Sequence, residues 1–231
     1  MSALFVAGAG TDVGKTHVTC GLIRSLRAAG APVRALKPLV SGFDPDDWAQ
    51  SDSGRLLAAL GQPLDGANLE VISPWRYRAP LAPDMAAVRE GRAVDPDAIF
   101  GFCRQAIAAP APGWLLIEGV GGAMSPIEAH LTNLDWMRGL GLPVLLVGGS
   151  YLGAISHTLT AIEALRRTDL TIAAVVISES PDSAPFDETV ASLTRLSSAP
   201  IIGVRRDAAD ADWTGALLPI LNQLDERARG A

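Results

Sequence analysis

The sequence predicts an α/β fold of the doubly wound type, with a mainly parallel sheet and helices on both faces. Short apolar runs alternate with longer amphipathic segments, and a glycine-rich loop follows the first run. Strands that are covered on both faces are apolar throughout, so these continuous runs are typical of a buried parallel sheet. On such folds, ligands bind beyond the carboxyl ends of the strands.

Apolar runs mark the expected strands, and amphipathic segments mark the expected helices. The strands are 3–8, 33–37, 114–118, 143–148, 171–177 and 200–204. The helices are about 14–29, 52–60, 95–109, 130–140, 153–167, 186–197 and 213–228, with Gly30 ending the first and Asp95-Pro96 opening the third. The stretch 42–94 is rich in Pro, Gly and Asp, and we expect an irregular excursion near the site. Residues 1–231 are expected to form one domain.

Composition excludes several classes of protein. The 231 residues are 48% hydrophobic and 19% charged, with a net charge of −6. This balance excludes a disordered chain and a coiled coil, and it argues against a nucleic-acid partner, which needs clustered basic residues. Cys20 and Cys103 match no disulfide framework or zinc motif, so we expect two buried thiols. No apolar run approaches the roughly 20 residues of a membrane span, so we expect no membrane partner and a cytoplasmic location.

The loop after the first strand predicts a phosphate-binding P-loop. It reads Gly8-Ala9-Gly10-Thr11-Asp12-Val13-Gly14-Lys15-Thr16, with five residues between Gly8 and the Gly-Lys pair where the common pattern has four. Glycines let backbone N–H groups converge on phosphate oxygens, and the start of the following helix adds the positive end of its dipole. We expect Lys15 to reach the outer phosphates and the Thr16 hydroxyl to bind Mg²⁺. His17 is expected to pack beside the nucleotide rather than to act as a base.

Two acidic residues are candidate metal ligands beside Thr16. Glu118 ends a buried strand, which is the position of a Walker B acid. The glycines that follow it, and that allow backbone to approach phosphate, are Gly119, Gly121 and Gly122. Asp52 is the weaker candidate because, taken alone, it is more typical of a helix N-cap. The expected Mg²⁺ ligands are Thr16, Asp52 and Glu118.

Only two of the 19 basic residues are lysines, Lys15 and Lys37. Lysine is a compact point charge and arginine a broad fork, so lysines kept in an arginine-rich chain are candidates for chemistry. Pro38 and Gly42 fix a turn after the second strand that directs Lys37 and Ser41 toward the phosphate end of the sheet. Two lysines there can neutralise charge on a transferring phosphoryl group. We expect Lys37→Ala to abolish the reaction without unfolding the chain.

Taken in order, these motifs resemble those of the dethiobiotin synthetase family over nearly the whole chain. The loop 8–16 is similar to the family's variant P-loop, and Lys37-Pro-Leu-Val-Ser41-Gly42 is similar to its second-strand motif. Ser51-Asp52 falls where the family has a metal-binding Asp, and Glu118-Gly-Val-Gly-Gly122 is similar to its Glu-Gly-Ala-Gly-Gly segment. Leu152-Gly153-Ala154-Ile155-Ser156-His157 resembles its Leu-Gly-x-Ile-Asn-His helix opening.

The resemblance implies an ATP- and Mg²⁺-dependent ligase that converts 7,8-diaminononanoate, CO₂ and ATP into dethiobiotin, ADP and phosphate. One amine takes up CO₂ as a carbamate, and the carbamate attacks the γ-phosphoryl group. The second amine then closes the ring on the resulting carbamic-phosphoric anhydride. In this scheme the catalytic residues are Lys15, Lys37, Thr11 and Asp12.

The resemblance also implies a homodimer whose substrate site lies between two subunits. In the first subunit it implies that Thr11, Lys37 and Ser41 contact the substrate. From the second subunit, it implies that a helix start binds the tail carboxylate through backbone N–H groups. The residues of that helix start are Leu152, Gly153, Ala154, Ile155 and Ser156.

The chain departs from the family where the nucleotide base is expected to bind. After strand 171–177 the family carries Asn-Asp, whereas this chain has Ser178 and Glu179. The other expected contacts on this side are Gly203 and Val204, and the proline that is common after that glycine is missing. A hydroxyl cannot offer the paired donor and acceptor of an amide. We therefore hypothesise looser base selection, with other nucleoside triphosphates used alongside ATP.

The alternative function is a nucleotide-switch P-loop ATPase of the partitioning or metal-insertion type, which shares the fold and often dimerises. Such proteins typically carry an additional lysine early in the P-loop, and no lysine precedes Lys15 here. The order of the motifs therefore favours the ligase.

Overall fold

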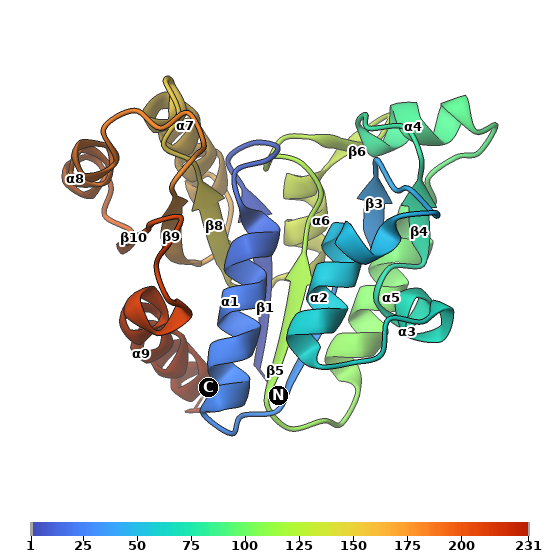
Figure 1. Cartoon of the computed structure of the whole chain (residues 1–231), viewed down its shortest axis with the longest axis horizontal. Coiled ribbons are helices and arrows are strands. Elements are labelled where there is room, and N and C mark those ends of the chain that lie inside the picture. Colours follow the sequence, from blue (N-terminus) through green and yellow to red (C-terminus); the bar gives the residue numbers. More distant parts are fainter. Residues whose placement is uncertain (1, 231) are drawn as a thin grey trace.

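A parallel six-stranded sheet forms the centre of the computed structural model, which describes residues 2–230 (Figure 1). The strand order is β10-β9-β8-β1-β5-β2, and every neighbouring pair is parallel. These strands are β1 (Ser2–Gly8), β2 (Val33–Leu36), β5 (Trp114–Glu118), β8 (Val144–Gly148), β9 (Ile172–Ser178) and β10 (Ile201–Val204). The predicted doubly wound α/β fold is confirmed. Met1 and Ala231, the ends of the expected domain, lie outside the described residues.

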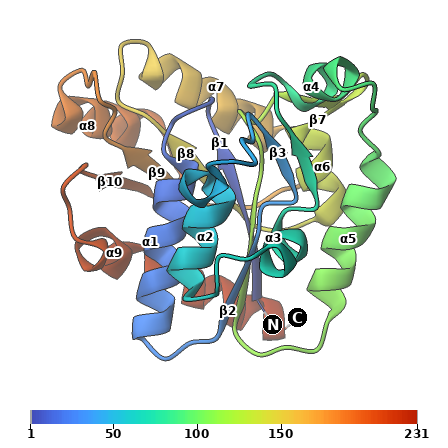
Figure 2. The ribbon, with the colours of Figure 1, turned by 45° about the vertical axis from the view of Figure 1, so that its right-hand side comes forward.

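Helices cover both faces of the sheet (Figures 1 and 2). On one face α1, α2 and α9 pack together, and on the other α5 packs against α6 and α7 against α8. Their bounds are α1 (Lys15–Ala28), α2 (Asp52–Leu60), α5 (Pro96–Ala108), α6 (Asn133–Leu140), α7 (Ala154–Arg166), α8 (Phe186–Leu196) and α9 (Asp210–Gly230). β1 lies between β5 and β8, so the loop that joins it to α1 sits at the middle of the carboxyl edge of the sheet.

Two helices begin away from their predicted positions, and local hydrogen bonds explain both. Before α6, the pairing of β7 (Leu131–Thr132) with β6 (Pro126–Glu128) holds the chain extended, and Thr132 then caps the helix in a capping box. α9 starts earlier than predicted because Asp212 accepts a hydrogen bond from the Ala209 N–H at 3.1 Å.

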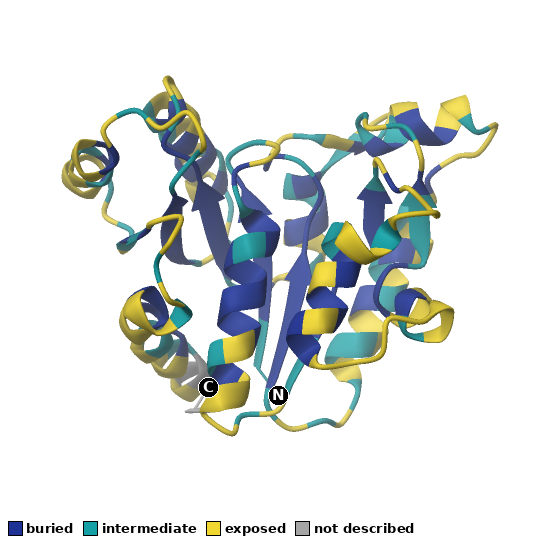
Figure 3. Ribbon diagram, viewed as in Figure 1, coloured by how far each residue is buried: buried dark blue, intermediate teal, exposed yellow. Residues whose placement is uncertain are grey.

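Burial of the sheet on both faces explains its continuous apolar runs. Figure 3 shows the central strands buried and the outer faces of the helices exposed. Phe5 of β1 is 0% exposed and packs edge-on against Trp136, with ring centroids 5.3 Å apart. The prediction of buried thiols is confirmed, since Cys20 and Cys103 are both free and buried. This burial raises the pKa of each thiol to about 12.

The stretch 42–94 is more regular than predicted. β3 (Leu39–Ser41) pairs in parallel with β4 (Trp75–Tyr77), and the intervening chain forms η1 (Trp48–Gln50), α2 and α3 (Gly66–Ile72). The segment ends in α4 (Pro83–Arg89), preceded by a loop that reaches the cavity described below. α2 matches the predicted helix 52–60, whereas the other elements are too short for hydrophobic periodicity to separate them from loops.

Candidate active site

The loop between β1 and α1 has the backbone of an anion site. α1 begins after Gly14, whose φ is 92° and which provides no side-chain cap, so the N–H groups of the first turn remain free for a ligand. A Cβ at Gly14 would lie 2.5 Å from Ser178 Oγ, and a Cβ at Gly8 would lie 2.6 Å from the Gly10 carbonyl oxygen. Close packing and positive φ therefore both require glycine in this loop.

Four charged side chains and a threonine meet at the floor of this loop. Glu118 Oε1 accepts hydrogen bonds from Thr16 Oγ1 at 2.6 Å and from Lys37 Nζ at 2.6 Å. Lys37 Nζ also lies 2.7 Å from Asp52 Oδ2. Lys15 Nζ donates to the Gly10 carbonyl oxygen at 3.3 Å. The structure therefore brings both lysines and all three expected metal ligands into one cluster.

Asp52 enters the cluster from the first turn of α2 and does not cap that helix. Ser51 is the cap, because its side chain accepts the Gly54 N–H at 3.3 Å. The interpretation of Asp52 alone as an N-cap is therefore wrong, and its carboxylate is free to pair with Lys37.

The two lysines have opposite pKa shifts. Burial lowers the pKa of Lys37, but the neighbouring carboxylates of Glu118 and Asp52 outweigh burial, so its pKa lies above the usual value. Burial raises the pKa of Asp52, but the charge of Lys37 and its hydrogen bond to Asp52 outweigh burial. The pKa of Asp52 therefore lies below its usual value. Burial, followed by repulsion from Lys37, lowers the pKa of Lys15 to about 8.

The donor set of this cluster fits a magnesium ion. Glu118 is 0% exposed, and its Oε2 atom is buried with no hydrogen-bond partner among the described residues. One hydroxyl and two carboxylates are oxygen ligands, and Mg²⁺ in nucleotide sites takes one or two carboxylates with substrate phosphates. Thr16, Asp52 and Glu118 would hold it. A bound cation would offset the free-energy cost of burying Glu118 Oε2 without a hydrogen-bond partner.

Asn133 holds the glycine segment that follows Glu118, and sequence reasoning missed it. Its Nδ2 donates to the Gly122 carbonyl oxygen at 2.8 Å and also to that of Val120. A Cβ at Gly122 would lie 3.2 Å from Gly10 Cα, so this segment packs directly on the phosphate loop. Asn133 opens α6, distant in sequence from both, and only the folded topology brings it to the site.

Two cavities open on opposite sides of the phosphate loop. The smaller holds about 220 Å³ and the larger about 470 Å³. The smaller is lined by Asp12, Val13, Gly14, His17, Arg55, Ser178, Glu179, Ser180, Pro181 and Arg206. The larger is lined by Thr11, Asp12, Lys15, Lys37, Ser41, Gly42, Asp52, Pro80, Leu81, Ala82, Pro83, Val120, Gly121 and Ser125. Asp12 lines both, and half of the predicted site residues line one cavity or the other.

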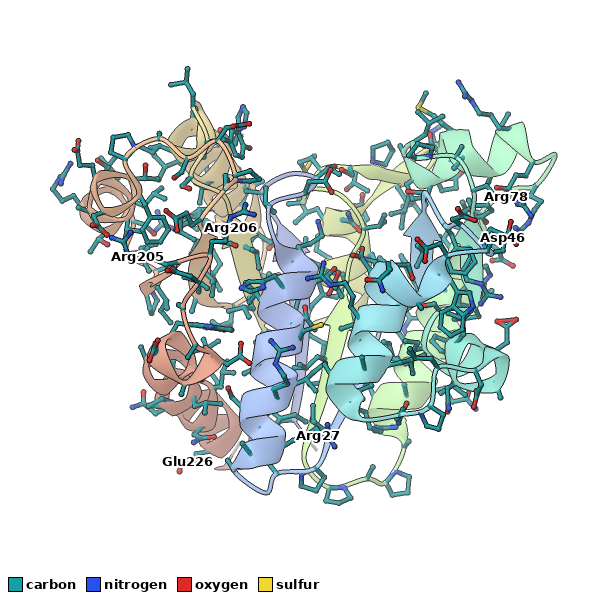
Figure 4. All side chains as sticks on the ribbon, viewed as in Figure 1. Arg27, Asp46, Arg78, Arg205, Arg206 and Glu226 are labelled. Carbon is teal, nitrogen blue, oxygen red and sulfur yellow. The ribbon has the colours of Figure 1, made fainter. Side chains whose placement is uncertain are left out.

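Two expected nucleotide contacts lie elsewhere. Gly203 lines a separate cavity beside Trp213, and Val204 is 1% exposed within β10. The chain turns into the smaller cavity only at Arg206, whose side chain is labelled in Figure 4 together with that of Arg205. Arg205 is held away from it by an ion pair with Asp187 at 2.6 Å. Arg55, Ser180 and Arg206 were missed because no motif marks them.

The predicted helix start 152–156 lines neither cavity of its own chain. It opens α7 after Gly153, whose φ is 96°, with no side-chain cap, so it repeats the backbone arrangement at the start of α1. Leu152, just before it, is 93% exposed. The Ala154 N–H donates to the Tyr151 carbonyl oxygen at 2.9 Å, so the N–H groups that this helix start can offer to a ligand are the next ones in its first turn.

Within residues 2–230, no helix combines the length and the apolar character that crossing a bilayer requires.

Comparisons with known proteins identify relatives over most of the chain. A family model described as an AAA domain matches residues 2–205. The chain is 56% identical over 196 residues to the ATP-dependent dethiobiotin synthetase BioD of Methylobacterium nodulans, covering 83% of this chain and 87% of that protein. It is 52% identical over 225 residues to the BioD of Phenylobacterium zucineum, covering 96% and 95%.

Similar solved structures include more distant proteins of the same fold. One is the septum site-determining protein MinD with Mg-ADP from Pyrococcus horikoshii, with a TM-score of 0.52 and 14% identity, covering 98% of this chain and 97% of that one. Another is in the MinC:MinD complex of Aquifex aeolicus, with a TM-score of 0.53 and 13% identity, covering 98% and 89%. At these identities the likeness concerns the fold alone.

We predict that the affinity for ADP falls as the pH rises through about 8. The Lys15 ammonium, whose pKa is lowered to about 8, loses its proton there, and a neutral amine attracts phosphate less than an ammonium does. Calorimetric titration between about pH 7 and about pH 9.5 should show weakening that approaches about tenfold per pH unit. Lys15→Arg, which stays charged, is the control and should lose the slope. A flat profile for the unaltered protein would contradict the prediction.

We also predict that Lys37→Ala lowers stability as well as activity. Glu118 is fully buried, so removing Lys37 leaves an uncompensated charge, at a cost of about 3–5 kcal/mol in the free energy of unfolding. This burial argues against the expectation that the substitution leaves the fold unaffected. The double variant Lys37→Met with Glu118→Gln should recover most of the stability and none of the activity, as denaturant unfolding and product assays would measure. Full stability of Lys37→Ala would show that the pair contributes nothing to the fold.

Proposed function

The chain belongs to the ATP-dependent dethiobiotin synthetase family, and from this premise we propose how its site performs the family's reaction. It is an ATP-dependent ligase that forms dethiobiotin from 7,8-diaminononanoate, CO₂ and ATP, releasing ADP and phosphate. The observation that carries the proposal is that Lys15 and Lys37 line one cavity beside a phosphate loop. We further propose that this single domain accounts for the whole reaction and works in the cytoplasm.

The larger cavity would hold the diamine, and the smaller one the nucleoside. Thr11, Asp12 and Ser41 line the larger cavity together with both lysines. The N–H groups at the uncapped start of α1 would bind the phosphates between the two spaces. In this arrangement the carbamate oxygen would lie next to the γ-phosphoryl group. Alignment of this kind and neutralisation of charge are the main demands of phosphoryl transfer.

The lysines would balance the charge that the reaction concentrates. The carbamate oxygen forms a bond to the γ-phosphorus as the bond to ADP breaks, and the ammonium groups of Lys15 and Lys37 offset the anionic oxygens. The second amine then attacks the carbamoyl carbon, the C–O bond to phosphate breaks, and a proton leaves the amine. When bound, Mg²⁺ would supply further neutralisation on the β- and γ-phosphates, with Thr16, Asp52 and Glu118 as its ligands.

The tail carboxylate would be bound by the α7 start of a second copy of the chain. The α7 start has a glycine with positive φ and no side-chain cap, like the phosphate-binding start of α1, whereas α2, α3, α5 and α6 are capped by side chains. Free N–H groups and a positive dipole end suit a carboxylate. Because this helix start lies outside the cavities of its own chain, we propose a homodimer in which each copy completes the site of the other.

The nucleotide-switch alternative is not favoured. The chain is more than half identical to two dethiobiotin synthetases, while its likeness to MinD stops at the fold.

We predict that the protein makes dethiobiotin and accepts more than one base. Ser178 lines the smaller cavity and offers only a hydroxyl, so base discrimination should be weak. Incubation with diaminononanoate, bicarbonate, Mg²⁺ and either ATP, GTP or CTP, followed by mass detection, measures product with each nucleotide. Nucleotide consumption without dethiobiotin would overturn the proposed function, and product with ATP alone would overturn only the relaxed base selection.

We predict that two inactive variants restore activity when mixed. Ser156→Asp places a negative charge at the α7 start, where it repels a carboxylate but suits the helix dipole, and Lys15→Ala disables the phosphate loop. A mixed dimer then contains one intact site, so random assortment should restore about a quarter of the activity of the unaltered protein. Ser156→Asn is the matched control and should remain active alone. If the two variants exchange subunits and activity still does not recover, the phosphate loop and the α7 start of one site belong to the same chain.

A further inference from the structure

Ser150 joins the loop after β8 to the loop after β9. It is 0% exposed. Its backbone N–H donates to Ser180 Oγ at 3.0 Å, and its own Oγ accepts the Ser180 N–H at 2.9 Å. Its Oγ lies 2.6 Å from Ser183 Oγ, and its carbonyl oxygen accepts the Ala184 N–H at 2.8 Å. We call Ser150, Ser180 and Ser183 the serine bridge.

The hydrogen bonds of the serine bridge have one consistent direction. Ser183 Oγ donates to the Ala184 carbonyl oxygen at 2.6 Å, so the proton between Ser150 and Ser183 comes from Ser150. The Oγ of Ser180 accepts from Ser150, and within residues 2–230 its own proton has no acceptor. Ser180 lines the smaller cavity, where the nucleoside would lie. Its hydroxyl is therefore a free donor toward a ligand, held in place by Ser150.

The two loops lead to different parts of the site. The last residue of β9 and the loop after it supply four residues of the wall of the smaller cavity, from Ser178 to Pro181. The loop after β8 continues through Tyr151 into the start of α7. Tyr151 accepts the Ala154 N–H on its carbonyl oxygen at 2.9 Å, and its hydroxyl lies 2.8 Å from His157 Nδ1. Ser180 is therefore linked to the α7 start by a short path, which runs through its hydrogen bonds to Ser150 and then along the chain through Tyr151.

We propose that Ser150 is a positioning residue that couples the nucleotide site to the substrate-tail site. A base that accepts the Ser180 hydroxyl proton polarises that oxygen and strengthens its bond to the Ser150 N–H. The strengthened bridge orders residues 150–154 and fixes the first turn of α7. The coupling rests on the proposed function, which gives that turn to the substrate carboxylate. By linkage, each ligand then raises the affinity of the protein for the other.

The test compares two serines that line the same cavity. Ser180→Ala removes the acceptor of the Ser150 N–H. The control, Ser178→Ala, changes the wall of the same cavity but leaves the serine bridge intact. Ser150→Ala is not used, because it removes a buried hydroxyl whose hydrogen bonds are all made. In hydrogen exchange of the full-length protein, adding Mg-ADP should slow the amides of residues 151–157 by about fivefold or more. The protection should persist in Ser178→Ala and disappear in Ser180→Ala, at ADP concentrations that saturate each variant.

A kinetic measurement separates positioning from loss of structure. At saturating ATP, Ser180→Ala should raise the KM for diaminononanoate by about fivefold or more, a larger change than any fall in kcat. Ser180→Thr, which keeps the hydroxyl, should restore the KM. Equal protection by ADP in Ser180→Ala and in the unaltered protein, or an unchanged KM, would overturn the coupling. The exchange measurement uses ADP alone, so it decides the coupling even if the protein makes no dethiobiotin, a result that would instead refute the proposed function.

Discussion

The site depends on one buried ion pair, between Lys37 and Glu118, formed where two neighbouring parallel strands end. β5 lies between β1 and β2, and its register places Ile117 opposite Leu36 and Glu118 opposite Val6. Lys37 and Glu118 therefore leave the sheet at the same level. β1 extends two residues further before its loop turns back toward α1. Thr16, in the first turn of α1, therefore donates from Oγ1 to the same carboxylate, at 2.6 Å from Glu118 Oε1. The order of the strands, more than any local motif, creates the cluster.

This pair explains why the two lysines differ. Lys37 is held by Glu118 and Asp52 and stays charged. The hydrogen-bond partner of Lys15 among residues 2–230 is a carbonyl oxygen, and burial, followed by repulsion from Lys37, lowers its pKa to about 8. A bound phosphate would therefore stabilise the Lys15 ammonium, because a neighbouring anion raises its pKa again. In the unliganded protein, Lys37 compensates the buried charge of Glu118. When a ligand brings other cations and anions to the cluster, the Lys37 ammonium can interact with the reacting groups instead.

The sequence allowed the strands and the phosphate loop to be predicted, because both leave local signals. Continuous apolar runs located each strand of the central sheet to within about two residues, and Lys15, Thr16, Lys37 and Glu118 followed from spacing and position. Asn133 could not be found in this way, since it opens a helix distant in sequence from the segment that it holds. Ser180 and Arg206 follow closely after predicted residues, Glu179 and Val204, but no motif marks them. Gly203, which the sequence suggested as a nucleotide contact, lines a separate cavity, and the path of the chain after β10 brings Arg206 to the smaller one instead.

The starts of α1 and α7, which lack a side-chain cap and follow a glycine with positive φ, give the strongest structural reason to propose an assembly of two chains. The reaction presents one substrate with an anion at each end, a carbamate that meets phosphate and a distant carboxylate. α1 and α7 follow neighbouring strands, β1 and β8, and both begin after a glycine with positive φ. In one chain, however, only the α1 start adjoins the larger cavity, while the α7 start opens to solvent beside the exposed Leu152. A second chain that packs over Leu152 would bury this apolar side chain. The same contact would bring the N–H groups of the α7 start to the larger cavity of the second chain.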